Sequence, residues 1–191
     1  MKGEWVLDNY FENKIISEKL LKERIIFLDK EINSATASEV VSKLLYLDSE
    51  SNDDIMLYIN SPGGEVSSGF MIYDTINIIK SDVQTISVGT AASMAAIILL
   101  VGTKGKRKIL PNSKVMLHDL SGEAKGKFKD VITEVKEMNK LHNKIFEIIE
   151  NNTNFTKEQI EENLKNDFWL NSEEALRFGL VDKIITNNKT I

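Results

Sequence analysis

The amino-acid sequence predicts an α/β fold in which short strands form a mostly parallel sheet and helices cover it. From residue 20 onward, short β-rich runs alternate with stretches whose apolar residues recur at helical spacing. Repeated strand-helix-strand units imply parallel strands joined by right-handed crossovers. The chain has 191 residues, 42% of them hydrophobic and 28% charged, as expected of one soluble globular domain.

The first elements alternate regularly. Residues 24–28 (RIIFL) and 55–59 (IMLYI) are predicted strands, because they are rich in β-branched and aromatic side chains. Residues 37–47 and 66–79 are predicted helices, because their apolar residues are spaced for one helical face. In the first helix, the residues expected to face inward are Val40, Val41, Leu44, Leu45 and Leu47.

An uncharged stretch from Thr85 to Gly102 has the length of a short membrane-spanning helix. It contains several Thr, Ser and Gly residues, and Gly89 with Thr90 interrupts it after a β-rich start. The stretch therefore divides better into a buried strand at 83–88, a turn and a buried helix at 91–101. We expect it to belong to the core and not to a membrane.

Residues 127–151 are predicted to form one helix of about 25 residues, near 37 Å long at about 1.5 Å per residue. This length is about twice the mean for globular proteins. Such a helix extends beyond a small domain, so we expect it to pack against another subunit. Its apolar residues, at steps of three and four, are Phe128, Val131, Ile132, Val135, Met138, Leu141, Ile145, Ile148 and Ile149.

The remaining elements are short. Strands are expected at 108–110, 114–117 and 181–185. Thr156 and Gln159 form a capping-box pattern, which begins a helix that ends near Leu164. Gly179 is placed to end a helix that begins near Ser172.

Composition excludes several functional classes. The net charge of -5 argues against a dedicated nucleic-acid-binding protein. The chain has no cysteine, which excludes a disulfide framework, a thiolate nucleophile and a cysteine metal site. The N-terminal segment lacks the apolar run and small-residue cleavage site of a signal peptide, so we expect a cytoplasmic protein.

Ser93 is the candidate nucleophile, because it begins a predicted helix directly after a strand, where unpaired N–H groups favour developing negative charge. A serine nucleophile needs an imidazole base, and the chain has two histidines. His118 ends a predicted strand, whereas His142 lies inside the long helix and is the weaker candidate. By themselves, these residues fit a small core serine and a solvated loop histidine better than a catalytic pair.

Two other places could support such chemistry. Residues 61–64 (SPGG) follow a predicted strand, and the paired glycines allow a sharp turn whose N–H groups face an anion, although a plain turn explains them as well. No Gly-Lys-Ser/Thr follows, so this is not a phosphate loop. Asp167 precedes the apolar residues 168–170, but spacing does not distinguish it among 29 acidic residues.

Several blocks of residues, in the same order along the chain, resemble the proteolytic subunit of Clp protease, the ClpP family. Each block is weakly specific, but together they are highly specific and cover the chain from about Leu20 to Ile185. The blocks are 58–64 (YINSPGG), 72–75 (IYDT), 91–94 (AASM), 105–107 (GKR), 110–112 (LPN), 116–118 (MLH), 174–175 (EA) and 179–182 (GLVD).

The resemblance implies a serine endopeptidase with a Ser-His-Asp triad. In this family pattern Ser93 is the nucleophile, His118 is the general base and then the general acid, and Asp167 orients the imidazole. The oxyanion hole falls at the backbone N–H groups of Gly64 and Met94. No metal and no cofactor are implied.

The resemblance also implies how substrate binds. A peptide should add as a strand between the segment after Gly64 and the segment after His118, through main-chain hydrogen bonds with little sequence selectivity. The resemblance therefore implies four substrate-binding residues, Glu65, Val66, Leu120 and Ser121.

The family architecture is a spiral of short β-α-β units, shared with crotonases, with a protruding handle helix. We expect a single ClpP-like peptidase domain over 1–191, with a divergent N-terminal segment at 1–19 and a handle region at about 121–151. In the family, two heptameric rings of identical subunits stack through these handles and enclose the active sites. The implied partners are an AAA+ unfoldase of ClpX, ClpA or ClpC type and unfolded protein substrates, with no nucleic acid and no membrane.

The chain departs from the family pattern at several positions. Residues 119–123 (DLSGE) replace a Gln-Pro step followed by two glycines, which brings charge to the expected peptide-binding edge. Asn166 replaces an arginine that takes part in contacts between rings. Met56 and Ile78 stand where tyrosine and phenylalanine are common in the unfoldase docking groove.

Two other functions fit parts of the pattern. A crotonase-type acyl-CoA enzyme shares the spiral fold and a backbone oxyanion hole, and it predicts binding of CoA. A weakly active or regulatory ClpP paralogue in a mixed barrel is the second alternative, because of the changes at 119–123 and Asn166.

Overall fold

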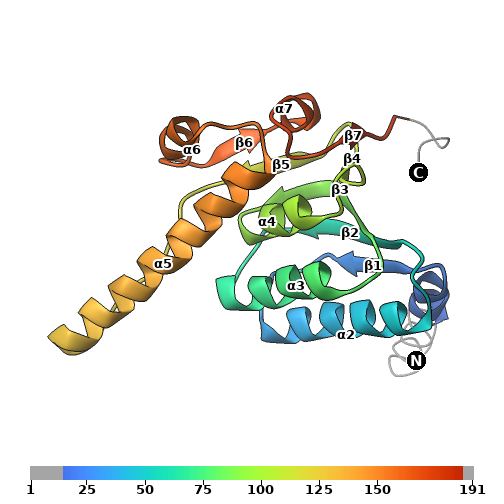
Figure 1. The fold of residues 1–191 in the computed structure, drawn as a ribbon, viewed down its shortest axis with the longest axis horizontal. Helices are drawn as coiled ribbons and strands as arrows, with labels where there is room; N and C mark the ends of the chain where they lie inside the picture. The colour runs from blue at the N-terminus through green and yellow to red at the C-terminus, as the bar shows by residue number, and fades with distance from the viewer. Residues whose placement is uncertain (1–14, 187–191) are drawn as a thin grey trace, which may run out of the picture.

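The structure, a computed structural model, describes residues 15–186. A seven-stranded sheet has the order β1-β2-β3-β4-β7, with β5 paired to β3 and β6 paired to β5 (Figure 1). Every pair is parallel except β5 with β6, which is antiparallel. The predicted α/β class with a mostly parallel sheet is therefore confirmed.

The elements follow the predicted order with small shifts. The strands are β1 (Ile25–Leu28), β2 (Ile55–Ser61), β3 (Val83–Ala92), β4 (Lys108–Ile109), β5 (Lys114–Leu117), β6 (Phe168–Leu170) and β7 (Lys183–Ile184). The helices are α2 (Ser34–Glu50), α3 (Val66–Ile78), α4 (Met94–Val101), α5 (Phe128–Asn152), α6 (Lys157–Asn163) and α7 (Ser172–Arg177). Residues 15–22 are also helical, and the rest of the N-terminal segment expected at 1–19 lies outside the described residues.

Helices α2 and α3 lie together along one side of β1 and β2 (Figure 1). The side chain of Asn33 begins α2 by accepting hydrogen bonds from the N–H groups of Ala35 and Thr36. The prediction of its inward face was right for Val40, Leu44 and Leu47, which are buried, and Val41 is half-buried. It was wrong for Leu45, whose side chain is 48% exposed, because this position turns off the buried stripe of the helix.

The uncharged stretch forms core, as predicted, but its internal boundary differs. Strand β3 continues to Ala92 because Thr90, Ala91 and Ala92 pair with β5. Helix α4 therefore begins at Met94 and not at Ala91. Every residue of α4 from Met94 to Leu100 is buried. Within residues 15–186, no helix combines the length and the apolar character needed to cross a membrane.

Helix α5 is the long helix that the periodicity predicts, and it points away from the body of the fold (Figure 1). Only Ile148 and Ile149, near its C-terminal end, are buried. Apolar residues toward its free end are exposed, with Phe128 at 81%. This pattern leaves an apolar stripe without a covering element in the described part of the single chain.

The C-terminal region confirms the predicted caps and adds one strand. Thr156 with Gln159 caps α6 as a capping box, and Asn171 with Glu174 does the same for α7. Gly179 follows α7 with a φ of 76°, which glycine adopts easily. Strand β6 was not predicted, because three residues paired to a distant strand carry no periodic signal.

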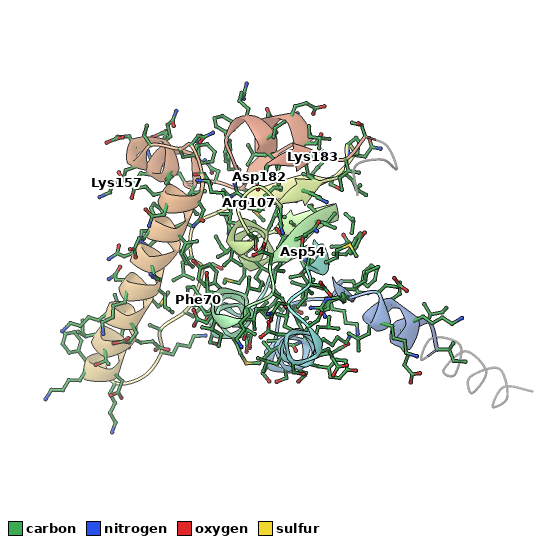
Figure 2. All side chains as sticks on the ribbon, turned by 45° about the vertical axis from the view of Figure 1, so that its right-hand side comes forward. Asp54, Phe70, Arg107, Lys157, Asp182 and Lys183 are labelled. Carbon is green, nitrogen blue, oxygen red and sulfur yellow. The ribbon has the colours of Figure 1, made fainter. Side chains whose placement is uncertain are left out.

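A buried ion pair fastens β4 and β7 to the end of α5. Arg107, 4% exposed, donates from Nε and Nη2 to the two carboxylate oxygens of Asp182, at 3.0 and 2.6 Å. Its Nη1 donates to the carbonyl of Asn152, the last residue of α5. Figure 2 shows Arg107 and Asp182 side by side at this edge of the sheet. The base of the projecting helix is thereby tied to the sheet.

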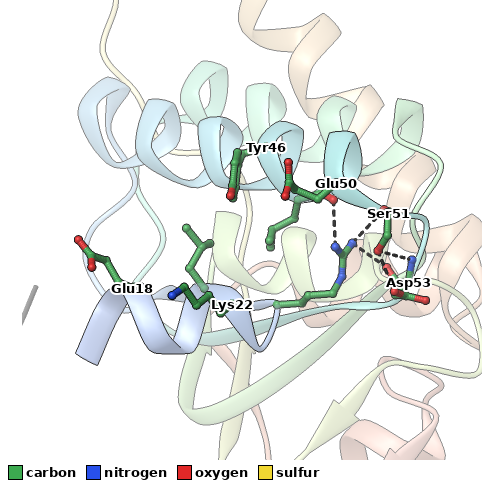
Figure 3. Close-up of a pocket in the computed structure, with 9 residues that line it drawn as sticks. Glu18, Lys22, Tyr46, Glu50, Ser51 and Asp53 are labelled. Carbon is green, nitrogen blue, oxygen red and sulfur yellow. Dashed lines mark hydrogen bonds between the residues drawn. The ribbon is translucent and has the colours of Figure 1, made fainter. Parts of the chain in front are cut away.

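Arg24 holds the C-terminal end of α2. It has a φ of 60°, uncommon for a residue with a Cβ. Its guanidinium donates to the carbonyls of Leu47, Ser51 and Asp53 (Figure 3). These contacts tie the end of α2 to the segment that follows it and place a cation at the negative end of the helix dipole.

Candidate active site

Ser93 lies in the one-residue turn between β3 and α4. Its φ of 54° and ψ of −125° lie outside the regions that a residue with a Cβ prefers. Its N–H donates to the carbonyl of Met116, so pairing of β3 with β5 holds the turn in place. A strained backbone that its surroundings enforce is common at functional sites, where it aims a side chain.

His118 directly follows β5, the strand that pairs with the end of β3. Because Ala92 and Met116 are partners in the register, the residues after both strands emerge at the same edge of the sheet. Ser93 Oγ lies 2.7 Å from His118 Nε2. This distance allows the hydroxyl to donate to the imidazole, as a serine nucleophile and its base require.

Neither glycine of the Gly63-Gly64 turn could carry a side chain, because Gly63 approaches Ser93 closely and Gly64 approaches Ile32. A Cβ on Gly63, whose φ is 90°, would lie 2.8 Å from the Cβ of Ser93 and 2.9 Å from the nitrogen of Met94. A Cβ on Gly64, whose φ is 147°, would collide with the carbonyl of Ile32. The sequence offered a plain turn or an anion-facing turn here, and the approach to Ser93 favours the second.

Two backbone N–H groups close to Ser93, those of Gly64 and Met94, have no hydrogen-bond partner among residues 15–186. Ile32 bonds the residues on both sides of Gly64, accepting from Glu65 and donating to Gly63, which leaves the N–H of Gly64 unpaired. The N–H of Met94, in the first turn of α4, is also unpaired. Both residues line the same pocket as Ser93. They can therefore donate to an oxyanion formed there.

The pocket beside Ser93 has a volume of about 70 Å³ and a wall of mixed polar and apolar character. Three of the four predicted substrate-binding residues line it, namely Val66, Leu120 and Ser121. Glu65 does not; its carboxylate accepts a hydrogen bond from Ser68 at the start of α3. Sequence reasoning missed four apolar lining residues, Ile97, Leu117, Ile145 and Ile149, since their apolar spacing signals only burial.

Asp167 stands opposite His118. Leu117 and Phe168 are partners in the antiparallel pair β5–β6, so the next residues outward are His118 and Asp167. In the described part of the chain, the two side chains share no hydrogen bond or ion pair, and Asp167 is exposed. The structure therefore brings Ser93 and His118 together and leaves Asp167 near them without contact.

A larger hollow, of about 480 Å³, lies away from this site. It is lined by Arg24, by helical residues such as Glu18 and Lys22, and by the C-terminal half of α2 (Figure 3). Neither Ser93 nor His118 contributes to it. Its size alone is no argument for chemistry, because its lining has no histidine to activate a nucleophile.

Comparison with known proteins agrees with the motifs. A sequence model of the Clp protease family matches residues 9–188. A curated relative from Carsonella ruddii (strain PV), named ATP-dependent Clp protease proteolytic subunit, is 45% identical over 185 residues. The matched region is 97% of this chain and 92% of the relative.

Proposed function

Because the chain belongs to the Clp protease family, we propose that it is a serine endopeptidase that hydrolyses peptides and unfolded proteins in the cytoplasm. The observation that carries this proposal is the 2.7 Å separation of Ser93 Oγ and His118 Nε2, next to two unpaired backbone N–H groups. A nucleophile, a base and oxyanion donors are the parts that acyl transfer requires.

The reaction starts when Ser93 Oγ attacks the scissile carbonyl carbon while its proton passes to His118 Nε2. The N–H groups of Gly64 and Met94 stabilise the oxyanion of the tetrahedral intermediate. The imidazolium then gives the proton to the leaving amine as the C–N bond breaks, which leaves an acyl-serine ester. Water, deprotonated by His118, attacks the ester, and the proton returns to Ser93 as the acid product leaves.

Asp167 is the proposed orienting carboxylate. Its position opposite His118 in the strand register supports this role. Movement of the segment after α6 would bring the carboxylate to His118 Nδ1, where it would fix the tautomer with a free Nε2. The triad then forms fully only when this segment is held in place.

Substrate binds in an extended conformation across the pocket. Val66 on one side and Leu120 with Ser121 on the other flank the space beside Ser93. Glu65 would act through its position beside the peptide, because its carboxylate accepts from Ser68, its N–H donates to Ile32 and its carbonyl accepts from Gly69. Main-chain pairing of this kind gives affinity with little dependence on the substrate side chains.

Assembly and partner are part of the same proposal. Residues 1–191 form one peptidase domain whose handle, about 121–151, stacks two heptameric rings of identical subunits. The exposed apolar stripe of α5, with Phe128, Ile132 and Val135, supports this contact. An AAA+ unfoldase of ClpX, ClpA or ClpC type would feed substrate, and exposed Phe27, Tyr46 and Ile78 offer it an apolar surface.

The test is labelling of the purified chain with a fluorophosphonate, which reacts with activated serines. The wild-type protein should be labelled at Ser93 and should cleave a fluorogenic peptide, and Ser93→Ala should lose both while the oligomer persists. Ser42→Ala, which changes an exposed serine of α2 outside the pocket, is the control and should keep both labelling and cleavage. Labelling that survives in Ser93→Ala would contradict the proposal, and an inactive wild-type chain would favour a regulatory subunit.

A further inference from the structure

The segment directly after His118 is held to helix α5 by a contact outside the Ser-His-Asp set. His142 Nε2 lies 3.1 Å from Asp119 Oδ1. Asp119 is the residue after His118 and lines the pocket beside Ser93. The contact therefore joins the proposed peptide-binding edge to the projecting helix.

His142 belongs to the face of α5 that lines the pocket. Residues 142, 145 and 149 follow one another at steps of three and four, so they share one side of the helix. Ile145 and Ile149 line the pocket and support it from this side. The imidazole also stacks on Phe146, with ring centroids 4.2 Å apart and planes inclined by 28°. Stacking fixes the ring, which is 33% exposed, in the orientation that reaches Asp119.

Few other contacts hold the edge. The N–H of Asp119 donates to the carbonyl of Leu164, and the N–H of Leu120 donates to Asp119 Oδ1, at 3.2 and 2.6 Å. Residues 119–127 form no helix or strand. The carboxylate of Asp119 thus contacts both the N–H of Leu120 and the imidazole of His142 on α5. Without His142 the edge would have greater freedom, and ordering it around a peptide would cost conformational entropy.

We propose that His142 is a positioning residue that acts through Asp119 to hold residues 119–121 in the conformation that accepts an extended peptide. This inference rests on the proposed peptidase function. It assigns a role to Asp119, one of the residues by which this chain departs from the family pattern. The ligand of residues 119–121 is the main chain of a substrate peptide, which would run past Leu120.

The test separates peptide binding from the chemistry of Ser93. In the full-length oligomer, His142→Phe keeps the stacking on Phe146 and removes the donor to Asp119. KM for a fluorogenic decapeptide should rise about threefold to fivefold, the size expected for the loss of one partly exposed hydrogen bond. The rate of Ser93 labelling by a small fluorophosphonate, which does not span the edge, should stay within about twofold because that reagent needs only the Ser93–His118 pair.

Three further variants complete the design. His142→Gln, which keeps an N–H donor, should restore KM toward the wild-type value. Asp119→Ala should raise KM as His142→Phe does, and the double variant should be no worse than Asp119→Ala, since both act through one contact. Lys140→Ala, which removes an exposed charge from the same helix, is the control and should leave KM unchanged.

Several outcomes would overturn the inference. An unchanged KM in His142→Phe would show that the contact has no part in peptide binding, and a fall in KM would show that it obstructs the edge. Equal losses of labelling and of peptide cleavage would mean that His142 acts on the Ser93–His118 pair instead. A wild-type chain that is not labelled at all would overturn the proposed function, and this inference with it.

Discussion

Asp167 occupies the position opposite His118 in the antiparallel pair β5–β6, and the two side chains make no hydrogen bond in the described part of the chain. Ser93 and His118, in contrast, already lie at 2.7 Å. The pairing of β3 with β5 therefore places the proposed nucleophile next to its proposed base. The proposed orienting carboxylate belongs to the segment between α6 and β6, and this segment would have to move to complete the proposed triad.

A substitution at Asp167 tests whether its carboxylate orients the imidazole of His118 during catalysis. Asp167→Asn should lower kcat for peptide hydrolysis by about 10³-fold to 10⁴-fold, because an amide can favour the wrong imidazole tautomer. Peptide hydrolysis at saturating substrate measures the effect. Glu162→Gln, which neutralises an exposed carboxylate of α6 paired with Lys165, is the control and should leave kcat unchanged. Equal activities of the two variants would remove Asp167 from the mechanism.

Gly64 tests the oxyanion hole. Gly64→Ala places a methyl group against the carbonyl of Ile32, so the turn must shift and its unpaired N–H moves away from Ser93. We expect kcat to fall about 10²-fold to 10³-fold, the usual effect of losing one oxyanion donor. Steady-state kinetics with the fluorogenic peptide measures this loss.

The control for Gly64 is Gly105→Ala. Gly105 also has a positive φ, 86°, but a Cβ there would have no neighbour within 4 Å. This variant should lose some thermal stability through backbone strain and keep kcat. If both variants were less stable but kept the wild-type kcat, the role of the Gly64 N–H would be refuted.

The Arg107–Asp182 pair predicts a large change in stability. Asp182→Asn leaves a buried guanidinium without its counter-charge, so the free energy of unfolding should fall by about 3 kcal/mol or more. Urea denaturation at neutral pH measures this. Glu39→Gln breaks a surface pair with Lys43 and should cost less than about 1 kcal/mol. Similar costs for the two variants would show that burial does not strengthen the Arg107 pair.

The same pair contributes to acid sensitivity. Burial raises the pKa of Asp182, but the hydrogen bonds and charge of Arg107 outweigh this, so the folded-state pKa lies below the ordinary value of 3.8. The stabilisation is full above that ordinary value and is lost as pH falls through the lowered folded-state pKa. The stability difference between wild type and Asp182→Asn should thus shrink below about pH 4. Urea midpoints of both proteins at several acidic pH values measure this difference. A difference that stayed constant as the pH fell would contradict the expectation.

Local patterns in the sequence determine much of this protein. The alternation of β-rich and helical runs predicts the α/β fold, and periodic apolar residues predict α5 to within one residue at each end. Capping boxes mark α6 as well, since the atoms of a cap lie within four residues of one another. Motifs in the family order predict membership of the Clp protease family. All these signals arise from neighbours along the chain or from ordered blocks.

Only the tertiary structure decided which distant groups meet. Strand β6 is specified by its pairing with β5, and no local period marks it. Spacing alone could not select Asp167, because its place opposite His118 follows from that same pairing. The contact of His142 with Asp119 joins positions more than twenty residues apart and requires the long helix to return beside the edge of the sheet. Contacts between residues far apart in sequence depend on how whole elements pack, which no short window of sequence records.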